Sequence, residues 1–247
     1  MSDDFIETLN ALRQRINQLD DALIGLLKQR IDVIHEVGAL KRANTPADCH
    51  IRPGREGEMH RRIHDAFTGS DFPPAAALVI WRQIIGASTH LESPITVALA
   101  SDTLSWHARE YFGRSVTCTS AGSIANACEA VIAKRATIAL IPAPSDDSLV
   151  EWANLASYTE LRVFAALPVV LADTESPACY AVAAVKNEAS GDDMSLLLVP
   201  AAEADAHSVI LARNAKEALV LVEGVSADAR CLGTLPKPII DPSLQPW

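Results

Sequence analysis

The chain has 247 residues, a formal net charge of −10 and a hydrophobic fraction of 49%. This length and composition suffice for two domains, or one large one, with a buried core, and they exclude extensive disorder. The acidic balance argues against nucleic acid or an acidic membrane surface as a partner, because no broad basic field is present to displace counterions. Any anionic ligand must therefore be bound locally.

The five cysteines are odd in number and widely spaced, and they form no C-x-x-C pair. This usage favours a reducing compartment over a disulfide framework. The first ten residues, MSDDFIETLN, are acidic and lack the basic and apolar regions of a signal peptide, and no apolar run reaches transmembrane length. We therefore expect a cytoplasmic protein.

The first predicted element is a long helix over residues 9–41. Steps of three and four residues along it select a stripe in which Arg30 is the one position that is not aliphatic. The stripe consists of Leu9, Leu12, Ile16, Leu19, Leu23, Leu26, Arg30, Val33, Val37 and Leu40. About 33 helical residues span roughly 50 Å, so we expect a partner helix to cover the stripe. Arginine in such a stripe is costly to bury unless an anion meets it.

Two of the other basic residues on this helix, Lys41 and Arg13, bear on the role of Arg30. Helical geometry places Lys41 on the same face as Arg30, about 16 Å further along, where the two side chains can close on one small dianion. Arg13 lies roughly 25 Å from Arg30 and about 100° off that face, so it can serve the site of a second, antiparallel copy instead. In the alternative interpretation, Arg13 and Lys41 are solvated and Arg30 extends out of a coiled coil.

A second helix is predicted from Arg52-Pro53 to Phe67, since proline suits a first helical position. Glu56 lies one turn before Met59, in line with the apolar stripe, and Arg55 is beside it. Glu56 is either a functional carboxylate or a first-turn carboxylate favoured by the helix dipole.

The same helix carries His60 and His64, an i, i+4 pair that could bind a metal. No third ligand follows at a recognisable spacing, so we expect surface histidines and no metal site.

A third helix is predicted over residues 75–92. Ser88 and Glu92 lie one turn apart near its end and point the same way. Taken alone, such residues are more often caps or solvated groups.

At Pro94 the periodicity changes from helix to strand. Residues 122–135 read as a helix among β-like runs, and this order predicts an α/β layer with a mixed, partly parallel sheet. The runs are ITVALA, VTCTS, ATIALIPA, LRVFAALPVVLA, CYAVAAV, MSLLLVPA, SVILA and ALVLVEG. We expect a multi-domain chain with an all-helical domain over 1–93 and a small α/β domain over 94–247. No Walker A motif, Gly-rich phosphate loop or G-x-S-x-G turn is present.

The helical half resembles the all-helical chorismate mutase family over about residues 5–93. The resemblance is carried by L-x-x-L-R-x-x-I-x-x-L-D-x-x-L-x-x-L-L-x-x-R, by V-G-x-x-K, by R-E opening the second helix and by S-x-x-x-E closing the third. Members are intertwined homodimers whose long first helices pair. The resemblance therefore implies a three-helix domain in an intertwined helical dimer that converts chorismate to prephenate in phenylalanine and tyrosine biosynthesis, without a cofactor.

The resemblance also implies roles for matching positions. Arg30, together with Arg13 of the other subunit, would hold the two carboxylates of chorismate, with Ser88 assisting. Glu56 would accept a hydrogen bond from the ring hydroxyl, and Arg55 would line the site beside it.

Lys41 and Glu92 would approach the ether oxygen of the breaking C–O bond. Many relatives have glutamine where Glu92 stands, and a glutamate can donate to that oxygen only while protonated. We therefore expect activity to rise as pH falls. A second departure is Arg52, which stands where relatives have an aspartate that contacts the hydroxyl.

The C-terminal half resembles the prephenate dehydratase part of bifunctional proteins, with departures. The hydrophobic frame is present in VALASDTLSWHAREYF and KRATIALIPAPSDD, but the G-P-x-G-x-Y-S, G-x-A-D-x-x-x-x-P-I-E-N, T-R-F and E-S-R-P signatures are absent. About 150 residues are also too few for the two-lobed dehydratase with its regulatory domain. We expect a degenerate, catalytically inactive module that serves folding, docking or regulation.

Two other functions fit the same residues. One is an isochorismate pyruvate lyase, which uses the same helical fold and similar cations. The other is a non-catalytic regulatory partner of the aromatic pathway, which would leave unexplained why all seven site residues are present.

Overall fold

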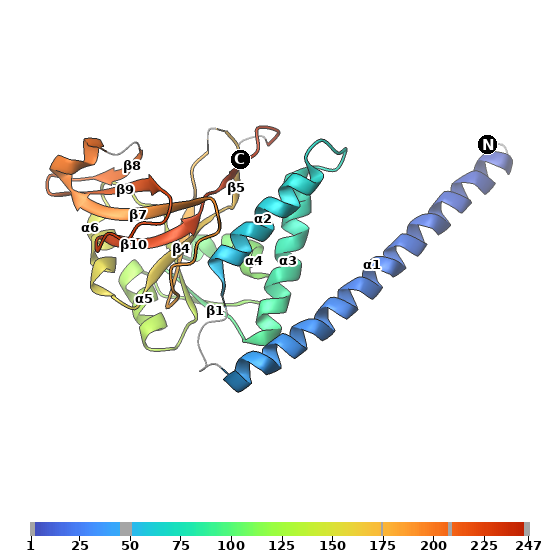
Figure 1. Ribbon diagram of the computed structural model, residues 1–247, viewed down its shortest axis with the longest axis horizontal. Helices are drawn as coiled ribbons and strands as arrows, with labels where there is room; N and C mark the ends of the chain where they lie inside the picture. Colours follow the sequence, from blue (N-terminus) through green and yellow to red (C-terminus); the bar gives the residue numbers. More distant parts are fainter. Residues whose placement is uncertain (1–2, 45–50, 174, 207–208, 245–247) are drawn as a thin grey trace. The chain divides into compact units, whose positions relative to one another are not determined.

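The computed structural model describes residues 3–44, 51–173, 175–206 and 209–244 (Figure 1). The chain divides into two compact units, Met1–Asp48 and Cys49–Trp247. The first unit is one continuous helix, α1 (Asp3–Asn44), which confirms the predicted long helix and extends it at both ends. Asp3 and Asp4 lie in its first turn, where carboxylates are stabilised by the positive end of the helix dipole.

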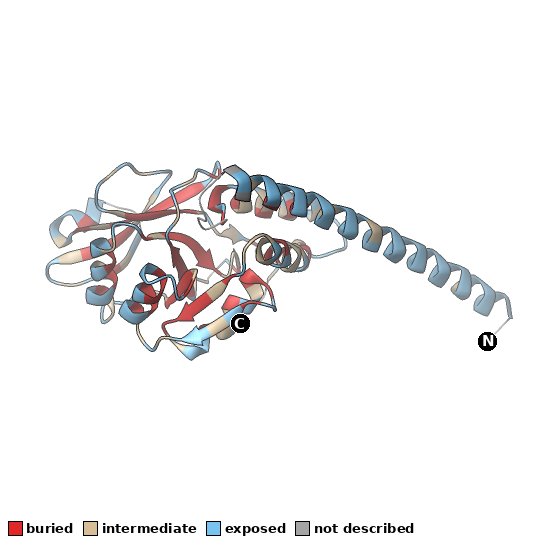
Figure 2. Cartoon of the chain, turned by 90° about the horizontal axis from the view of Figure 1, so that it is seen from below, coloured by how far each residue is buried: buried red, intermediate tan, exposed pale blue. Residues whose placement is uncertain are grey.

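The apolar stripe of α1 lies at the surface, as the colouring of Figure 2 shows for most of the helix. Leu19, Leu23 and Leu26 keep 65%, 58% and 61% of their surface exposed. A helix gains little stability from its own backbone and usually depends on packing of an apolar face. The exposed stripe therefore gives α1 little of that stabilisation within the described part of the chain.

Two helices, α2 (Pro53–Phe67) and α3 (Pro74–Glu92), open the second unit and pack against each other. Both begin at a proline, as expected for a residue that lacks a backbone N–H. Gly86 lets α3 approach the chain after it, since a Cβ there would lie 2.5 Å from the carbonyl oxygen of Phe112. These bounds confirm the predicted second and third helices to within one residue.

A five-stranded sheet follows, with the order β2 (Thr117–Ser120), β1 (Thr96–Leu99), β3 (Ile138–Pro142), β6 (Cys179–Ala183) and β4 (Arg162–Leu167). β1 is parallel to β2 and β3, whereas β6 is antiparallel to β3 and β4. The mixed α/β sheet expected after Pro94 is thus confirmed.

Helices cover both faces of this sheet. Ala98 and Ile141 point into a core shared with α5 (Ile124–Ile132) and α6 (Leu149–Ala153). Their strand neighbours Val97 and Leu140 point into a second core shared with α4 (Ser105–Phe112). Because both faces are buried at β1, β3 and β6, these strands read as nearly continuous apolar runs, whereas the edge strand β2 is polar and mostly exposed.

A second, antiparallel sheet was not predicted as a separate layer. Its order is β10 (Cys231–Pro236), β7 (Asp193–Pro200), β9 (Glu217–Glu223) and β8 (Val209–Arg213). Gly233 of β10 packs directly on the backbone of Val163 in β4, where a Cβ would lie 2.0 Å from the Val163 oxygen. The remaining elements are the parallel pair β5 (Val170–Leu171) and β11 (Ile239–Ile240) and the short 3-10 helices η1 (Asp102–Leu104), η2 (Asn154–Ser157) and η3 (Ala201–Ala206).

The change from helix to strand falls where the sequence placed it, between the end of α3 at Glu92 and the start of β1 at Thr96. However, α2 and α3 share a compact unit with the α/β region, because α3 packs on α4 and α2 packs on β10. The domain boundary between residues 93 and 94 stays a prediction. None of the described helices is long and apolar enough to cross a membrane.

Candidate functional site

The seven predicted site residues are divided between the two units. Arg13, Arg30 and Lys41 belong to α1, and the other four belong to α2 and α3. Because α1 is continuous, Arg30 and Lys41 lie on one face about 16 Å apart, as helical spacing requires. Arg13 is exposed.

Glu56 is held in a buried ionic cluster that joins three helices. Its Oε2 atom accepts a hydrogen bond from Arg82 Nη1 of α3 at 2.6 Å and another from the Tyr111 hydroxyl of α4 at 3.1 Å. The side chains of Arg82 and Glu56 are 4% and 12% exposed. An ion pair so well shielded from water is costly to break on one side, so the Glu56 carboxylate is fixed in place.

Arg82 has a second anchor on α4. Its Nε donates to the carbonyl oxygen of Tyr111 at 3.1 Å, Nη2 donates to the same oxygen, and the guanidinium lies 3.6 Å from the centre of the Tyr111 ring. Burial and the neighbouring Glu56 carboxylate raise the pKa of Tyr111, so its hydroxyl stays protonated and keeps donating to Glu56.

His60 was expected at the surface, and that expectation is wrong. The residue is 4% exposed, and its Nε2 lies 3.0 Å from Arg82 Nη1. Burial, followed by the charges of Arg82 and Arg61, holds the pKa of His60 well below its usual value of 6.5. His60 is therefore neutral and accepts a hydrogen bond from Arg82. Among the described residues, no group of three or more His, Cys, Asp or Glu side chains could hold a metal ion.

Ser88 and Glu92 lie one turn apart at the end of α3, as predicted. Ser88 is buried, and its hydroxyl donates to the carbonyl oxygen of Ile84 at 2.6 Å. Arg55 is exposed in the first turn of α2, next to Glu56.

Arg52 pairs with Glu188 of the loop after β6. Arg52 Nε donates to Glu188 Oε1 at 2.9 Å, and Oε2 accepts from the backbone N–H of Gly54 at 3.3 Å. The hydrogen bonds from Arg52 lower the pKa of Glu188, so a carboxylate stabilises the positive end of α2. In this structure the guanidinium of Arg52 thus ties α2 to the α/β region.

Arg82 and Tyr111 were missed from the sequence. Arg82 stands in the apolar run LVIWRQII, one turn after the buried Leu78, and a charge at such a position indicates a buried partner. The sequence therefore contained an indication that Arg82 has a buried partner. Tyr111 carried no signal of its own, because its role depends on the packing of α4 against α3.

These elements define a protein with an N-terminal helical region over residues 3–92 and a following α/β region with a mixed sheet. Residues 12–93 match the family model of chorismate mutase type II. A curated relative, the bifunctional chorismate mutase/prephenate dehydratase of Aquifex aeolicus (strain VF5), is 32% identical over 144 residues. The match covers 56% of this chain and 39% of the relative, so the chain spans about two fifths of the relative's length.

A solved structure was also found, that of a prephenate dehydratase from Streptococcus mutans. The match covers 51% of this chain and 81% of the dehydratase chain. The sequence identity is 10% and the TM-score is 0.35.

Proposed function

We propose that this protein is a chorismate mutase, which rearranges chorismate to prephenate in the biosynthesis of phenylalanine and tyrosine. The observation that carries the proposal is the family match over residues 12–93, a segment that contains all seven predicted site residues on α1, α2 and α3. The relative from Aquifex aeolicus supports it, since its name includes the same activity.

The reaction suits a site built from fixed charges. In this Claisen rearrangement one C–O bond breaks while one C–C bond forms within a single molecule, so the enzyme supplies neither a nucleophile nor a cofactor. What it must supply is the reactive conformation of the substrate and stabilisation of the negative charge that develops on the ether oxygen. Arg30 and Arg13 would hold the two carboxylates, while Lys41 and Glu92 would donate to the ether oxygen.

The ring hydroxyl of chorismate would donate to Glu56. Both hydrogen bonds from Arg82 and Tyr111 go to Oε2 of this carboxylate, and Oε1 can accept from the substrate. The carboxylate is positioned before the substrate arrives, so little reorganisation is needed during the reaction. Arg55 would line the site beside it, and Ser88 would assist at the substrate carboxylates.

A second copy of the chain is needed for this site. Arg13 is too far along α1 to reach a ligand held between Arg30 and Lys41 of its own helix. The exposed apolar stripe of α1 gives a second copy a surface to bury. We therefore propose a homodimer that pairs through α1 and exchanges Arg13 between its two sites.

We further propose that the α/β region has no dehydratase activity, because its sequence lacks the polar signatures of that enzyme. We assign the protein to the cytoplasm. The free thiols of Cys118, Cys128, Cys179 and Cys231, two of them buried, suit a reducing compartment.

Parallel assays with two substrates test the proposed function against its alternative. The full chain is incubated with chorismate or with isochorismate, and prephenate, phenylpyruvate and pyruvate are measured. We expect prephenate from chorismate and no enzymatic phenylpyruvate at neutral pH. Faster release of pyruvate from isochorismate would favour the lyase, and phenylpyruvate would show that the dehydratase is active.

A further inference from the structure

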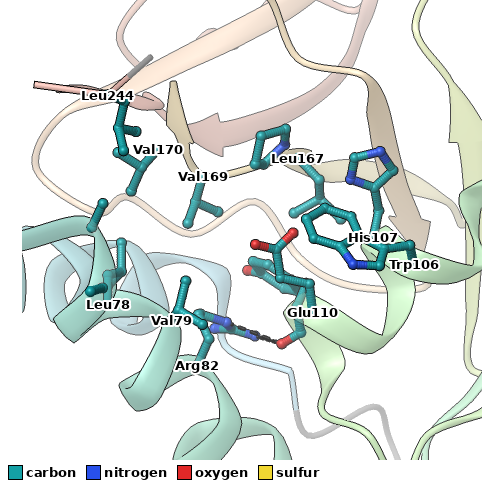
Figure 3. A pocket seen from close by; sticks show the side chains of 14 residues that line it. Leu78, Val79, Arg82, Trp106, His107, Glu110, Leu167, Val169, Val170 and Leu244 are labelled. Atoms are coloured by element: carbon teal, nitrogen blue, oxygen red, sulfur yellow. Dashed lines mark hydrogen bonds between the residues drawn. The ribbon is translucent and has the colours of Figure 1, made fainter. Parts of the chain in front are cut away.

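A pocket within the second unit is not used by the proposed reaction. It lies between α3, α4 and the chain that joins β4 to β5, and its volume is about 220 Å³ (Figure 3). Its walls are mostly apolar and include Val79, Val169, Val170 and Trp106. A dry cavity of about 150 Å³ is enough to bind benzene, so this one can hold a ring with a short substituent.

One carboxylate points into this space. Figure 3 shows Glu110 of α4 directed toward the middle of the labelled side chains. Within the described part of the chain, the carboxylate of Glu110 has no hydrogen-bond or ion-pair partner. Burial raises the pKa of Glu110 and the charge of Arg82 opposes that effect, so the ionised group lacks a full counter-charge.

The charges around the pocket leave one negative charge uncompensated. Arg82 lies on the pocket wall, but its guanidinium already pairs with Glu56 at 2.6 Å. The guanidinium is therefore committed to Glu56, and the Glu110 carboxylate has no ion-pair partner of its own among the described residues. His60 and His107 add no positive charge at neutral pH, because burial lowers the pKa of each.

Trp106 and His107 form one part of the pocket wall. The Nδ1 atom of His107 is buried and has no hydrogen-bond partner among the described residues. The indole of Trp106 packs edge-on against His107, with ring centres 5.1 Å apart. The buried Nδ1 atom is closed to a ligand, whereas the indole of Trp106 is exposed and its face attracts a cation.

We propose that this pocket binds a small apolar amine in its protonated form, with a ring-sized body between Val79, Val169 and Val170 and the ammonium group against Glu110. A cation supplies the charge that the pocket lacks. An anionic ligand would meet a second carboxylate and no uncommitted cation on the described walls, so the site discriminates by charge.

Calorimetric titration of the full chain with three matched probes tests this site. Benzylamine is protonated at pH 7, benzyl alcohol is its neutral counterpart, and benzoate carries the opposite charge. We expect benzylamine to bind about 10- to 100-fold more tightly than benzyl alcohol, the range expected for one charged hydrogen bond. Benzoate should not bind measurably.

Two variants in the pocket and one control variant locate the effect. Glu110→Gln should reduce the affinity for benzylamine to that for benzyl alcohol, while Glu151→Gln, at an exposed position on α6, should change neither. Val79→Phe should weaken both ligands by filling the cavity, and circular dichroism checks that each variant is folded. The proposal is overturned if benzylamine does not bind, if the alcohol or benzoate binds as tightly, or if Glu110→Gln retains the preference.

Discussion

In the proposed site, residues that do not touch the substrate would position the Glu56 carboxylate for it. Arg82 and Tyr111 come from two other helices and both bind Oε2. Each is buried, so neither can exchange its bond for one with water. Removal of the Tyr111 hydroxyl should therefore disturb the position of Glu56 while the ion pair between Arg82 and Glu56 is kept.

Tyr111→Phe tests this positioning. The variant keeps the ring under Arg82 but loses the hydroxyl that donates to Glu56 at 3.1 Å. We expect kcat/KM for chorismate to fall roughly tenfold, the effect of losing one hydrogen bond to a charged group. Tyr158→Phe, on the α/β region, is the matched control and should leave the rate unchanged. Equal rates for wild type and Tyr111→Phe would contradict the positioning role.

The proposed donor role of Glu92 predicts that the rate of the reaction depends on pH. Because a carboxyl group donates to the ether oxygen only while protonated, kcat/KM for chorismate should rise as pH falls, and Glu92→Gln should flatten the profile. Initial rates across pH 5 to 8, with a control at an exposed carboxylate such as Glu151→Gln, measure this. A wild-type rate that does not depend on pH would rule out the donor role of Glu92.

The burial of His60 predicts that the free energy of unfolding depends on pH. Its pKa in the folded chain is depressed below the usual 6.5, so the unfolded chain binds the proton more readily. Stability from the neutral ring is complete above pH 6.5 and is lost as pH falls below it, at up to about 1.4 kcal/mol per pH unit.

Urea unfolding of wild type and His60→Gln between pH 7 and pH 5 measures that loss. Glutamine can still accept from Arg82 but does not titrate, so the variant should lose less stability over the same interval. Parallel loss in the two proteins would show that His60 does not contribute.

At the level of single residues, the sequence indicated which side chains are candidates for the site but not which residues they contact. Glu56 was recognised because it interrupts an apolar stripe at helical spacing. Its attachment to Tyr111 was out of reach, since the two residues are 55 positions apart and meet only when α4 packs on α3. The burial of His60 was also out of reach, because its partner Arg82 lies on a different helix.

Of the helices and strands, α1 matters most for the proposed function. It is the longest helix described, and its apolar stripe is exposed. If two copies pair through this stripe, each proposed site takes Arg30 from one copy and Arg13 from the other.

Mixed dimers of two inactive variants test this arrangement. Arg13→Ala and Arg30→Ala homodimers each lack one cation in both sites and should be inactive. When the two chains are co-expressed, half of the dimers are mixed, and each mixed dimer has one site with both cations intact. We expect the mixture to recover about a quarter of the wild-type rate, because a cation removed from a preorganised site costs roughly 10² to 10³ in rate. No recovery would mean that Arg13 and Arg30 act within one chain or not at all.

Elements with a strong period were predicted well, and short ones were not. The helices α1, α2 and α3 were anticipated because apolar residues recur at helical spacing and prolines mark two of the starts. The eight-residue helix α4 was missed, although Ala108, Tyr111 and Phe112 show the spacing of a buried helical face. Since α4 supplies Tyr111 and Glu110, neither the anchor of Glu56 nor the pocket beside α4 could be predicted from the sequence.

In the whole molecule, α2 and α3 belong to the same compact unit as the α/β region, although the periodicity of the sequence changes at Pro94. The helices α2 and α3 pack with the α/β region, through Arg82 and Tyr111 on one side and Arg52 and Glu188 on the other. A region without dehydratase signatures thus still holds residues of the proposed mutase site in place. The second antiparallel sheet was not foreseen, because alternation along a strand does not reveal which sheet the strand joins.

The rate of prephenate formation from chorismate by the full chain, compared with that of Arg30→Ala at the same concentration, tests the proposed function most directly. The molar mass of each is determined by sedimentation in parallel. We predict prephenate formation by the wild type, loss of about 10² to 10³ in rate for the variant, and a dimer in both cases. A wild-type chain that forms no prephenate, or an Arg30→Ala chain that loses activity only because its dimer dissociates, would contradict the assignment.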